Sequence, residues 1–345
     1  MERIDLAAGW FKHNINPKTG LLEYIYDPAK DQYLDGDKHI RRLACLWAMC
    51  AYAKTADVRS AYERAVTSGL DYYLKFARPG SNGGLYLDIN GKTDIASAAF
   101  AILTLTECPD YPRRGQWIRQ FADGIVQQQD RAGAYRTLVG KSGIKEGIDY
   151  YPGEAMLALM KAYRELNNPA YLASVERAFP FYQTYWRRER QTAFVPWHSQ
   201  ADLLLYQATG KGEYASFVFE LNDWLIERHQ SYVWASEDSK GCFGSGADSR
   251  PGNSTASFLE GLNAAYRLAE LMGDRQHMHK YTNSIRTGTR CLLQMQYTKR
   301  NSFYLKNPER AVGGFTASLS DMTQRIDFTQ HAIMSLMAAY KNRIF

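Results

Sequence analysis

Acidic and aromatic residues occur together just before an apolar stretch in the middle of the chain. Asp149, Tyr150, Tyr151 and Glu154 surround a Pro-Gly pair, and residues 155–163 then repeat apolar side chains at helical spacing. A carboxylate in the first turn of a helix is favoured by the helix dipole, so a cap with aromatic packing explains this stretch as well as a site does. A pair of carboxylates also suits glycoside cleavage, in which one protonates the leaving oxygen and the other activates water or attacks the anomeric carbon.

Further residues with acid–base chemistry lie at other predicted helix starts. Asp94 is a candidate carboxylate, although an N-cap role is equally expected there. Asp327 and His331 are four residues apart and would share one helix face, so they could pair and make the histidine a general base. His198 is a candidate acid, base or orienting group. The simpler interpretation of His331 is a structural one, in which its hydrogen bonds are made within the protein beside a helix start.

Aromatic, basic and amide side chains near the same positions suit the binding of a sugar. Trp197 and the two tyrosines would stack on a sugar ring or form hydrogen bonds with it, while Asp37 and Gln330 would add polar contacts. Arg41 and Arg325 would meet an acidic group if the substrate has one. An arginine with a tyrosine or histidine also suits proton abstraction beside a uronate carboxylate, as in lyases and epimerases.

The elements that must position these residues are paired helices. The pairs cover residues 39–52 with 58–76, 95–106 with 115–129, 152–166 with 169–187, 199–208 with 213–229, and 254–272 with 276–295. A first helix over 2–14 and a last one over 327–342 would pair with each other and close a ring of six hairpins. The repeat of about 50 to 60 residues is typical of an array, and no change in composition marks a boundary. We therefore predict one all-α domain over residues 1–345, with short β-hairpins in its loops.

This arrangement resembles the (α/α)6 toroid proteins, which have six inner and six outer helices. One branch contains the six-hairpin glycosidases with related sugar epimerases and uronate-specific hydrolases. The terpenoid cyclase and prenyltransferase branch has repeats with a glutamine followed by a Gly-aromatic turn. Residues 129–135 (Gln-Asp-Arg-Ala-Gly-Ala-Tyr) resemble this pattern, and residues 83–86 and 313–315 resemble its Gly-aromatic part. However, residues 35–38 lack the last carboxylate of the cyclase Asp-x-Asp-Asp motif, and no zinc-binding set of Asp, Cys and His can be assembled.

The resemblance implies a funnel surrounded by the N-terminal ends of the inner helices. If the first helix of each pair is the inner one, polar residues lie at all six ends, and the fifth contributes Arg250, Asn253 and Ser254. The carbohydrate branch implies an enzyme that hydrolyses a poly- or oligosaccharide with paired carboxylates in this funnel. A lyase or sugar epimerase, and a non-catalytic toroid that binds glycan or protein, remain as alternatives.

The charge and the residue patterns of the sequence limit the partners and cofactors that we expect. The net charge of +6 comes from 42 Lys and Arg against 36 Asp and Glu without a basic tract, so we expect a saccharide partner and no nucleic acid. No run reaches membrane-spanning length, and the Gly-Gly pairs lack a phosphate-loop pattern, so we expect no membrane span and no cofactor. No pair of the five cysteines has metal-ligand spacing, so we also expect no metal site. Unpaired cysteines and the lack of a visible signal peptide favour the cytoplasm, with the periplasm or secretion still possible if a leader has been removed.

Overall fold

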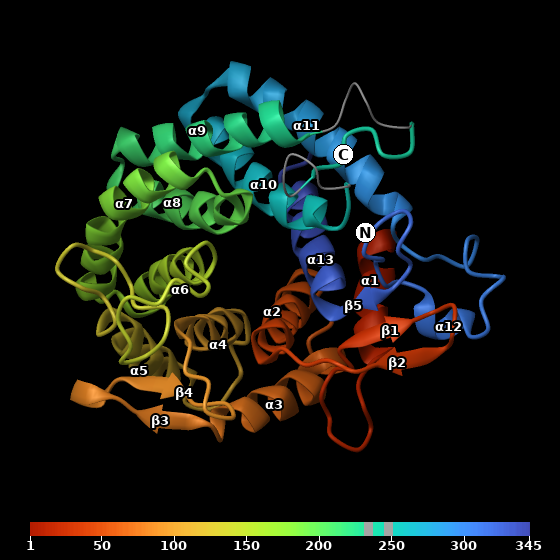
Figure 1. Cartoon of the computed structure of the whole chain (residues 1–345), viewed down its shortest axis with the longest axis horizontal. Coiled ribbons are helices and arrows are strands. Elements are labelled where there is room, and N and C mark those ends of the chain that lie inside the picture. The colour runs from red at the N-terminus through yellow and green to blue at the C-terminus, as the bar shows by residue number, and fades with distance from the viewer. Residues whose placement is uncertain (231–236, 245–250) are drawn as a thin grey trace.

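Inner helices stand around a common centre in this computed structural model, which describes residues 1–230, 237–244 and 251–345 (Figure 1). These helices are α2 (His39–Thr55), α4 (Ile95–Glu107), α6 (Tyr151–Leu166), α8 (Val195–Thr209), α10 (Ser254–Met272) and α13 (Ile326–Lys341). Each packs against the next, and α13 packs against both α10 and α2, so the ring is closed. Arg250, expected at the fifth end, lies outside the described residues.

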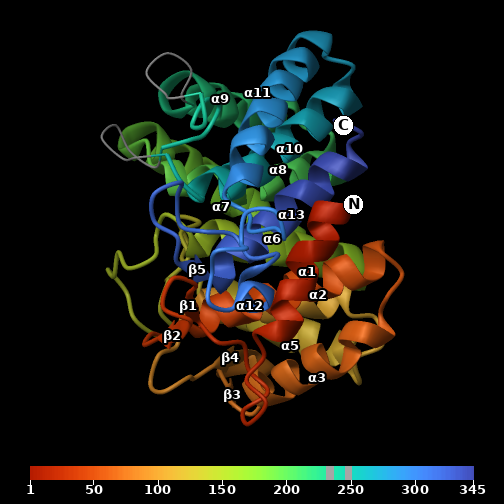
Figure 2. The same cartoon turned by 90° about the vertical axis from the view of Figure 1, so that its right-hand side faces the viewer.

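Outer helices cover the ring and run between the inner ones. They are α1 (Glu2–His13), α3 (Ser60–Leu74), α5 (Arg114–Val126), α7 (Pro169–Glu189), α9 (Gly212–His229) and α11 (Arg275–Gln294). The first helix, α1, packs against the last, α13, as both views show (Figures 1 and 2). The predicted (α/α)6 toroid, with first and last helices closing the ring, is confirmed for the described part of the chain.

The inner and outer helices differ in how much of their surface is buried. In the inner helix α4, every residue from Ile95 to Leu105 is buried, because neighbours surround it on all sides. In the outer helix α11, buried residues recur every three or four positions from Tyr281 to Leu292, so only one face meets the core. Among the described residues, no helix is both long enough and apolar enough to cross a bilayer.

Short strands connect the helices on the side of the ring where the inner helices begin. β1 (Ile25–Asp27) lies between β2 (Gln32–Leu34) and β5 (Gln324–Arg325), and β3 (Ala77–Pro79) pairs with β4 (Leu85–Leu87). Short helical turns are η1 (Ser81–Gly83), η2 (Thr192–Phe194) and α12 (Pro308–Ala311). The pairing of Ile25 with Arg325 fixes the start of α13 against the N-terminal segment.

The glutamine and Gly-aromatic segments form a joint that recurs between outer helices. Each time, a glutamine just beyond an outer helix donates to the carbonyl of the following glycine and to a carbonyl of the next outer helix. The sets are Gln129 with Gly133 and Ser174, Gln230 with Gly241 and Ser284, and Gln296 with Gly313 and Arg3, at 2.9–3.0 Å. The glycine is needed because φ of Gly133 is +98° and a Cβ there would collide with the Arg177 carbonyl. In this chain, the glutamine signature is therefore a structural joint.

Helix α8 begins four residues before its predicted start at Ser199. Pro196 lies in its first turn, where the N–H that proline lacks would have no helical partner. The predicted helix over 199–208 left this proline outside. Trp197 and His198 consequently belong to the helix and are held rigidly by it.

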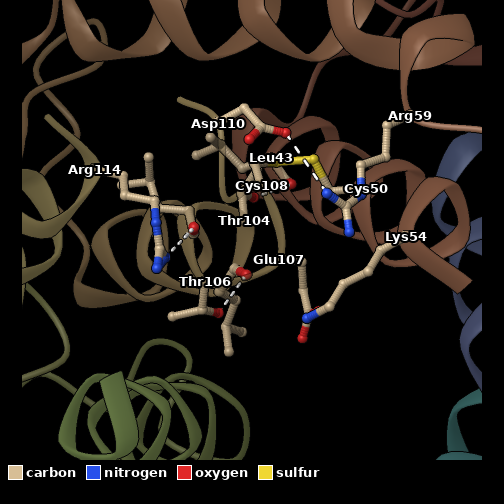
Figure 3. Close-up of a disulfide and its surroundings, with 12 residues drawn as sticks. Leu43, Cys50, Lys54, Arg59, Thr104, Thr106, Glu107, Cys108, Asp110 and Arg114 are labelled. Atoms are coloured by element: carbon tan, nitrogen blue, oxygen red, sulfur yellow. Dashed lines mark hydrogen bonds and ion pairs between the residues drawn. A yellow bond between two sulfur atoms is a disulfide. The ribbon is translucent and has the colours of Figure 1, made fainter. Parts of the chain in front are cut away.

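Four of the five cysteines are paired, so the expectation of unpaired cysteines is wrong. Cys50 of α2 is bonded to Cys108 at the end of α4 (Figure 3), with a Cα–Cα distance of 5.6 Å. Cys242 is bonded to Cys291 in α11, with a Cα–Cα distance of 5.4 Å. Cys45 alone is free and is buried. The ring brings the ends of neighbouring inner helices together although 58 residues separate the first pair, which spacing along the chain did not reveal. One reason for expecting a reducing compartment is thus removed.

Candidate active site

A cavity of about 640 Å³ lies at the N-terminal ends of the inner helices, and all six contribute to its wall. We call it the central cavity. The predicted site residues on its wall are Arg41 from α2, Asp149, Tyr150, Tyr151 and Glu154 at the start of α6, Trp197 from α8, and Arg325, Asp327, Gln330 and His331 at the start of α13. Segments far apart in the sequence therefore meet here, as the toroid implied.

Two predicted catalytic residues lie off this wall. Asp94 is 2% exposed and caps α4, because its carboxylate accepts hydrogen bonds from the backbone N–H and the hydroxyl of Ser97, both at 2.8 Å. His198 is 1% exposed and stacks on Phe194 with ring centroids 3.5 Å apart. Burial holds the pKa of His198 well below its usual value, so this imidazole is neutral and belongs to the core.

A predicted binding residue also lies off the wall. The half-exposed carboxylate of Asp37 pairs with Arg42, and His39 Nε2 is 3.6 Å from it. These contacts hold the loop before α2 onto its first turn. The structure therefore places Asp37 outside the central cavity.

Asp327 is held between two arginines. Arg325 donates to both of its oxygens, from Nε at 2.6 Å and from Nη2 at 2.9 Å, and Arg41 Nε lies 3.1 Å from Oδ2. Burial tends to lower the pKa of Arg325, but the bonds to Asp327 outweigh it, so the net shift is upward. The carboxylate thus orients two guanidinium groups on the cavity wall, and the bidentate geometry fixes the plane of the Arg325 guanidinium.

His331 pairs with Glu260 and not with Asp327, so the predicted i,i+4 pair is wrong. Its Nδ1 lies 2.6 Å from Oε1 of Glu260, a residue of α10 that is 4% exposed. Asp327 is directed instead to the arginines of α2 and β5. Burial raises the pKa of Glu260, and the contact with His331 opposes that rise. A histidine on a cavity wall, oriented through one ring nitrogen by a buried carboxylate, has the arrangement of a general acid–base group.

Glu154 is a buried carboxyl group on the cavity wall. It is 5% exposed, and its Oε2 has no hydrogen-bond partner in the described part of the chain. Burial raises its pKa well above the usual value, and the negative charge of Asp94 raises it further. These shifts favour the protonated form of Glu154, which is able to donate its proton.

Asp149 and the neighbouring tyrosines complete this side of the cavity. Asp149 Oδ1 accepts a hydrogen bond of 2.7 Å from the hydroxyl of Tyr185 in α7. Burial raises the pKa of Tyr150, and the negative charge of Asp149 raises it further. Burial also raises the pKa of Tyr151, and the negative charge of Asp94 adds to that rise. Both phenols are therefore protonated near neutral pH and serve as hydrogen-bond donors.

Trp197 and Gln330, which also line the cavity, are buried as well. Trp197 contacts the ring of Phe100 at a centroid distance of 5.5 Å and that of His331 at 6.0 Å. Gln330 is 1% exposed, and its Nε2 has no partner among the described residues. Buried polar atoms are normally paired, so the free atoms of Glu154 and Gln330 on one cavity wall indicate a place for a polar ligand.

Sequence reasoning missed Lys38 and Glu260. Lys38 precedes α2 and lines the cavity, while Glu260 lies almost two turns inside α10 and reaches the site only through His331. The candidates predicted from the sequence lie at helix starts, and Glu260 is farther inside its helix. Its signal in the sequence is a single carboxylate within the otherwise apolar run from Phe258 to Leu262.

Comparisons with known proteins find likeness at the level of structure. No family model and no curated protein matches the chain. A D-mannose isomerase is 14% identical with a TM-score of 0.67, over 99% of this chain and 96% of that one. A family 76 glycoside hydrolase from a bovine Bacteroides thetaiotaomicron strain is 13% identical with a TM-score of 0.69, over 99% and 78%. An unsaturated glucuronyl hydrolase specific for heparin is 10% identical with a TM-score of 0.66, over 99% and 97%. The chain thus has the (α/α)6 toroid fold of the six-hairpin glycosidase-like proteins.

Proposed function

We propose that this protein is a carbohydrate-active enzyme that hydrolyses a glycosidic bond in the central cavity. The observation that carries the proposal is Glu154, a buried carboxyl group with a raised pKa and an unpartnered oxygen on the wall of an aromatic-lined cavity. In glycoside hydrolysis such a group protonates the leaving oxygen. The structurally similar proteins include glycoside hydrolases, which supports the proposal.

A second carboxylate is needed to activate water or to attack the anomeric carbon, and Asp149 is the better candidate. It lies on the same wall, and within the described residues it accepts one hydrogen bond from a side chain, that of Tyr185. Asp327 is less suited, because three bonds from Arg41 and Arg325 occupy its oxygens. We assign Asp327 the task of orienting the two arginines.

The arginine pair and Lys38 favour a saccharide with an acidic group. These three cations lie on the wall together, with Asp327 as the carboxylate that the arginines share. Guanidinium groups with fixed planes bind carboxylates through paired hydrogen bonds. A uronate or another anionic sugar would thus meet an excess of positive charge on this side of the cavity.

Epimerisation or isomerisation of a sugar is the second candidate, and the His331–Glu260 pair favours it. A base of this kind removes a proton from carbon beside a carbonyl and returns it on another face or another carbon. The similar D-mannose isomerase supports this alternative. Because Tyr150 and Tyr151 are protonated, a tyrosine base of the kind expected for a lyase has less support.

The test is to incubate the purified protein in D2O with neutral and acidic oligosaccharides and to follow the products by mass spectrometry. Shorter saturated saccharides, lost in Glu154→Gln, would support hydrolysis. Deuterium on carbon without cleavage, lost in His331→Ala, would move the assignment to an epimerase or isomerase. A product lighter by one water would indicate a lyase. Binding with no product from any substrate would contradict an enzymatic function and indicate a binding protein.

A further inference from the structure

A second cavity of about 1030 Å³ lies on the outer wall of the ring, between α1 and residues 299–312. We call it the α1 groove. Apolar atoms of Leu6, Gly9, Pro308 and Val312 contribute to its lining. Ser302 also lines it, is 1% exposed, and has a hydroxyl without a hydrogen-bond partner in the described part of the chain. None of these residues belongs to the central cavity.

Two aromatic side chains project from the edge of the α1 groove. Phe303 is 78% exposed and Tyr304 is 60% exposed, and their rings meet edge to face at 5.6 Å. The segment that leads into α12 extends outward from the ring at the right-hand edge of Figure 1. Adjacent exposed aromatic residues beside an apolar hollow are typical of an interaction surface.

The rim of the α1 groove carries charges of both signs. Glu2 and Glu309 are acidic, Lys299 and Lys306 are basic, and all four side chains are exposed. Within the described residues, none of the four forms an ion pair, whereas many other charges of this chain are paired. The groove therefore presents free acidic and basic groups beside one another.

We propose that the α1 groove is an interface with a second copy of this chain, related to the first by a two-fold axis. A two-fold interface sets one surface patch against itself, so the patch must contain both halves of each contact. This patch contains a hollow and an aromatic projection, and charged groups of both signs, with Glu2, Asp5 and Glu309 on the acidic side and Lys299 and Lys306 on the basic side. In the dimer, the projection of each copy enters the groove of the other, and lysines of one rim meet glutamates of the other.

Sedimentation equilibrium of the full chain over a wide range of concentration tests the proposal. We expect the wild type to approach twice the chain mass of 39.3 kDa. Phe303→Ser removes the projecting ring and should weaken dimerisation by about tenfold or more, as loss of a buried aromatic anchor does. Phe345→Ser is the matched control, because Phe345 is 70% exposed and is not part of the groove lining. A wild type that stays monomeric throughout, or a Phe303→Ser variant that dimerises normally, would overturn the proposal.

Charge reversal provides a second test that does not depend on the aromatic projection. One variant carries Lys299→Glu with Lys306→Glu, and the other carries Glu2→Lys with Glu309→Lys. Each alone should dimerise more weakly, because like charges then face each other, and an equimolar mixture should recover a mixed dimer. Failure of the mixture to associate, with melting curves like the wild type, would contradict the pairing of opposite charges across the axis. Saccharide binding by a monomeric protein at this groove would reassign it to a ligand site.

Discussion

Glu154 is the residue whose protonation most directly governs the proposed hydrolysis. Glu154→Gln keeps the shape of a neutral side chain but removes the proton, so we expect turnover to fall by about a hundredfold or more with little change in melting temperature. In the wild type, the raised pKa extends the protonated, active form of Glu154 to higher pH, and the rate should fall as the pH rises through this raised pKa. Initial rates measured against pH check both expectations.

Asp94→Asn is the control for this assignment. Asparagine preserves the cap of α4 but removes the negative charge that raises the pKa of Glu154. The alkaline fall in rate should therefore move to lower pH while the maximal rate is largely retained. Full activity in Glu154→Gln would remove Glu154 from the catalytic role.

Glu260 is expected to act through His331 rather than on the substrate. Glu260→Gln preserves the size of the side chain but removes the carboxylate that orients the imidazole at 2.6 Å. If His331 is the acid–base group, turnover or deuterium exchange should fall by about tenfold or more, with a smaller change in KM. Gln200→Met is the matched control, since Gln200 contacts the same carboxylate only at 3.4 Å and should matter little. An unchanged rate in Glu260→Gln would argue against this pair as the proton-transfer group.

At the scale of elements, the glutamine joints hold neighbouring outer helices together. In Gln129→Ala, two carbonyls lose their donor and the Ser174 hydroxyl loses its acceptor. At about 1 kcal/mol for each of these partly buried hydrogen bonds, we expect a loss of about 2–3 kcal/mol in the free energy of unfolding, measured with urea. Gln116→Ala, at an exposed position of α5, should change it by less than about 0.5 kcal/mol. Equal effects of the two variants would mean that the joint contributes no particular stability.

The sequence predicts elements better than it predicts the contacts between them. Helix periodicity located the inner and outer helices because each pattern depends on local spacing. The partner of His331 was missed because it comes from α10, and Asp327 could not be recognised as engaged because Arg41 comes from α2. Only the toroid resemblance predicted that polar residues at separate helix starts surround one funnel, and the wall of the central cavity includes some of them but not Asp94 or His198. Which of them face the cavity depends on helix rotation, as the buried His198 shows.

At the scale of the whole molecule, two disulfides cross-link the helices of the ring. Cys50–Cys108 ties two neighbouring inner helices, and Cys242–Cys291 ties the segment after α9 to α11. Cross-links that span 58 and 49 residues restrict the unfolded chain, and the chain-entropy relation gives about 4 kcal/mol for each. We therefore expect a reductant to lower the melting temperature strongly.

The state of the cysteines also tests the compartment in which the protein folds. Without reductant, alkylation followed by mass spectrometry should label one thiol, that of Cys45, and only after unfolding, because this side chain is buried. A variant with Cys50→Ala and Cys108→Ala should lose part of the sensitivity to reductant, since it keeps the second cross-link. Five reactive thiols in the unfolded protein would contradict both disulfides and restore the prediction of a reducing compartment. Two intact disulfides in protein isolated from its own cells would favour an oxidising compartment, because reducing compartments keep such thiols free.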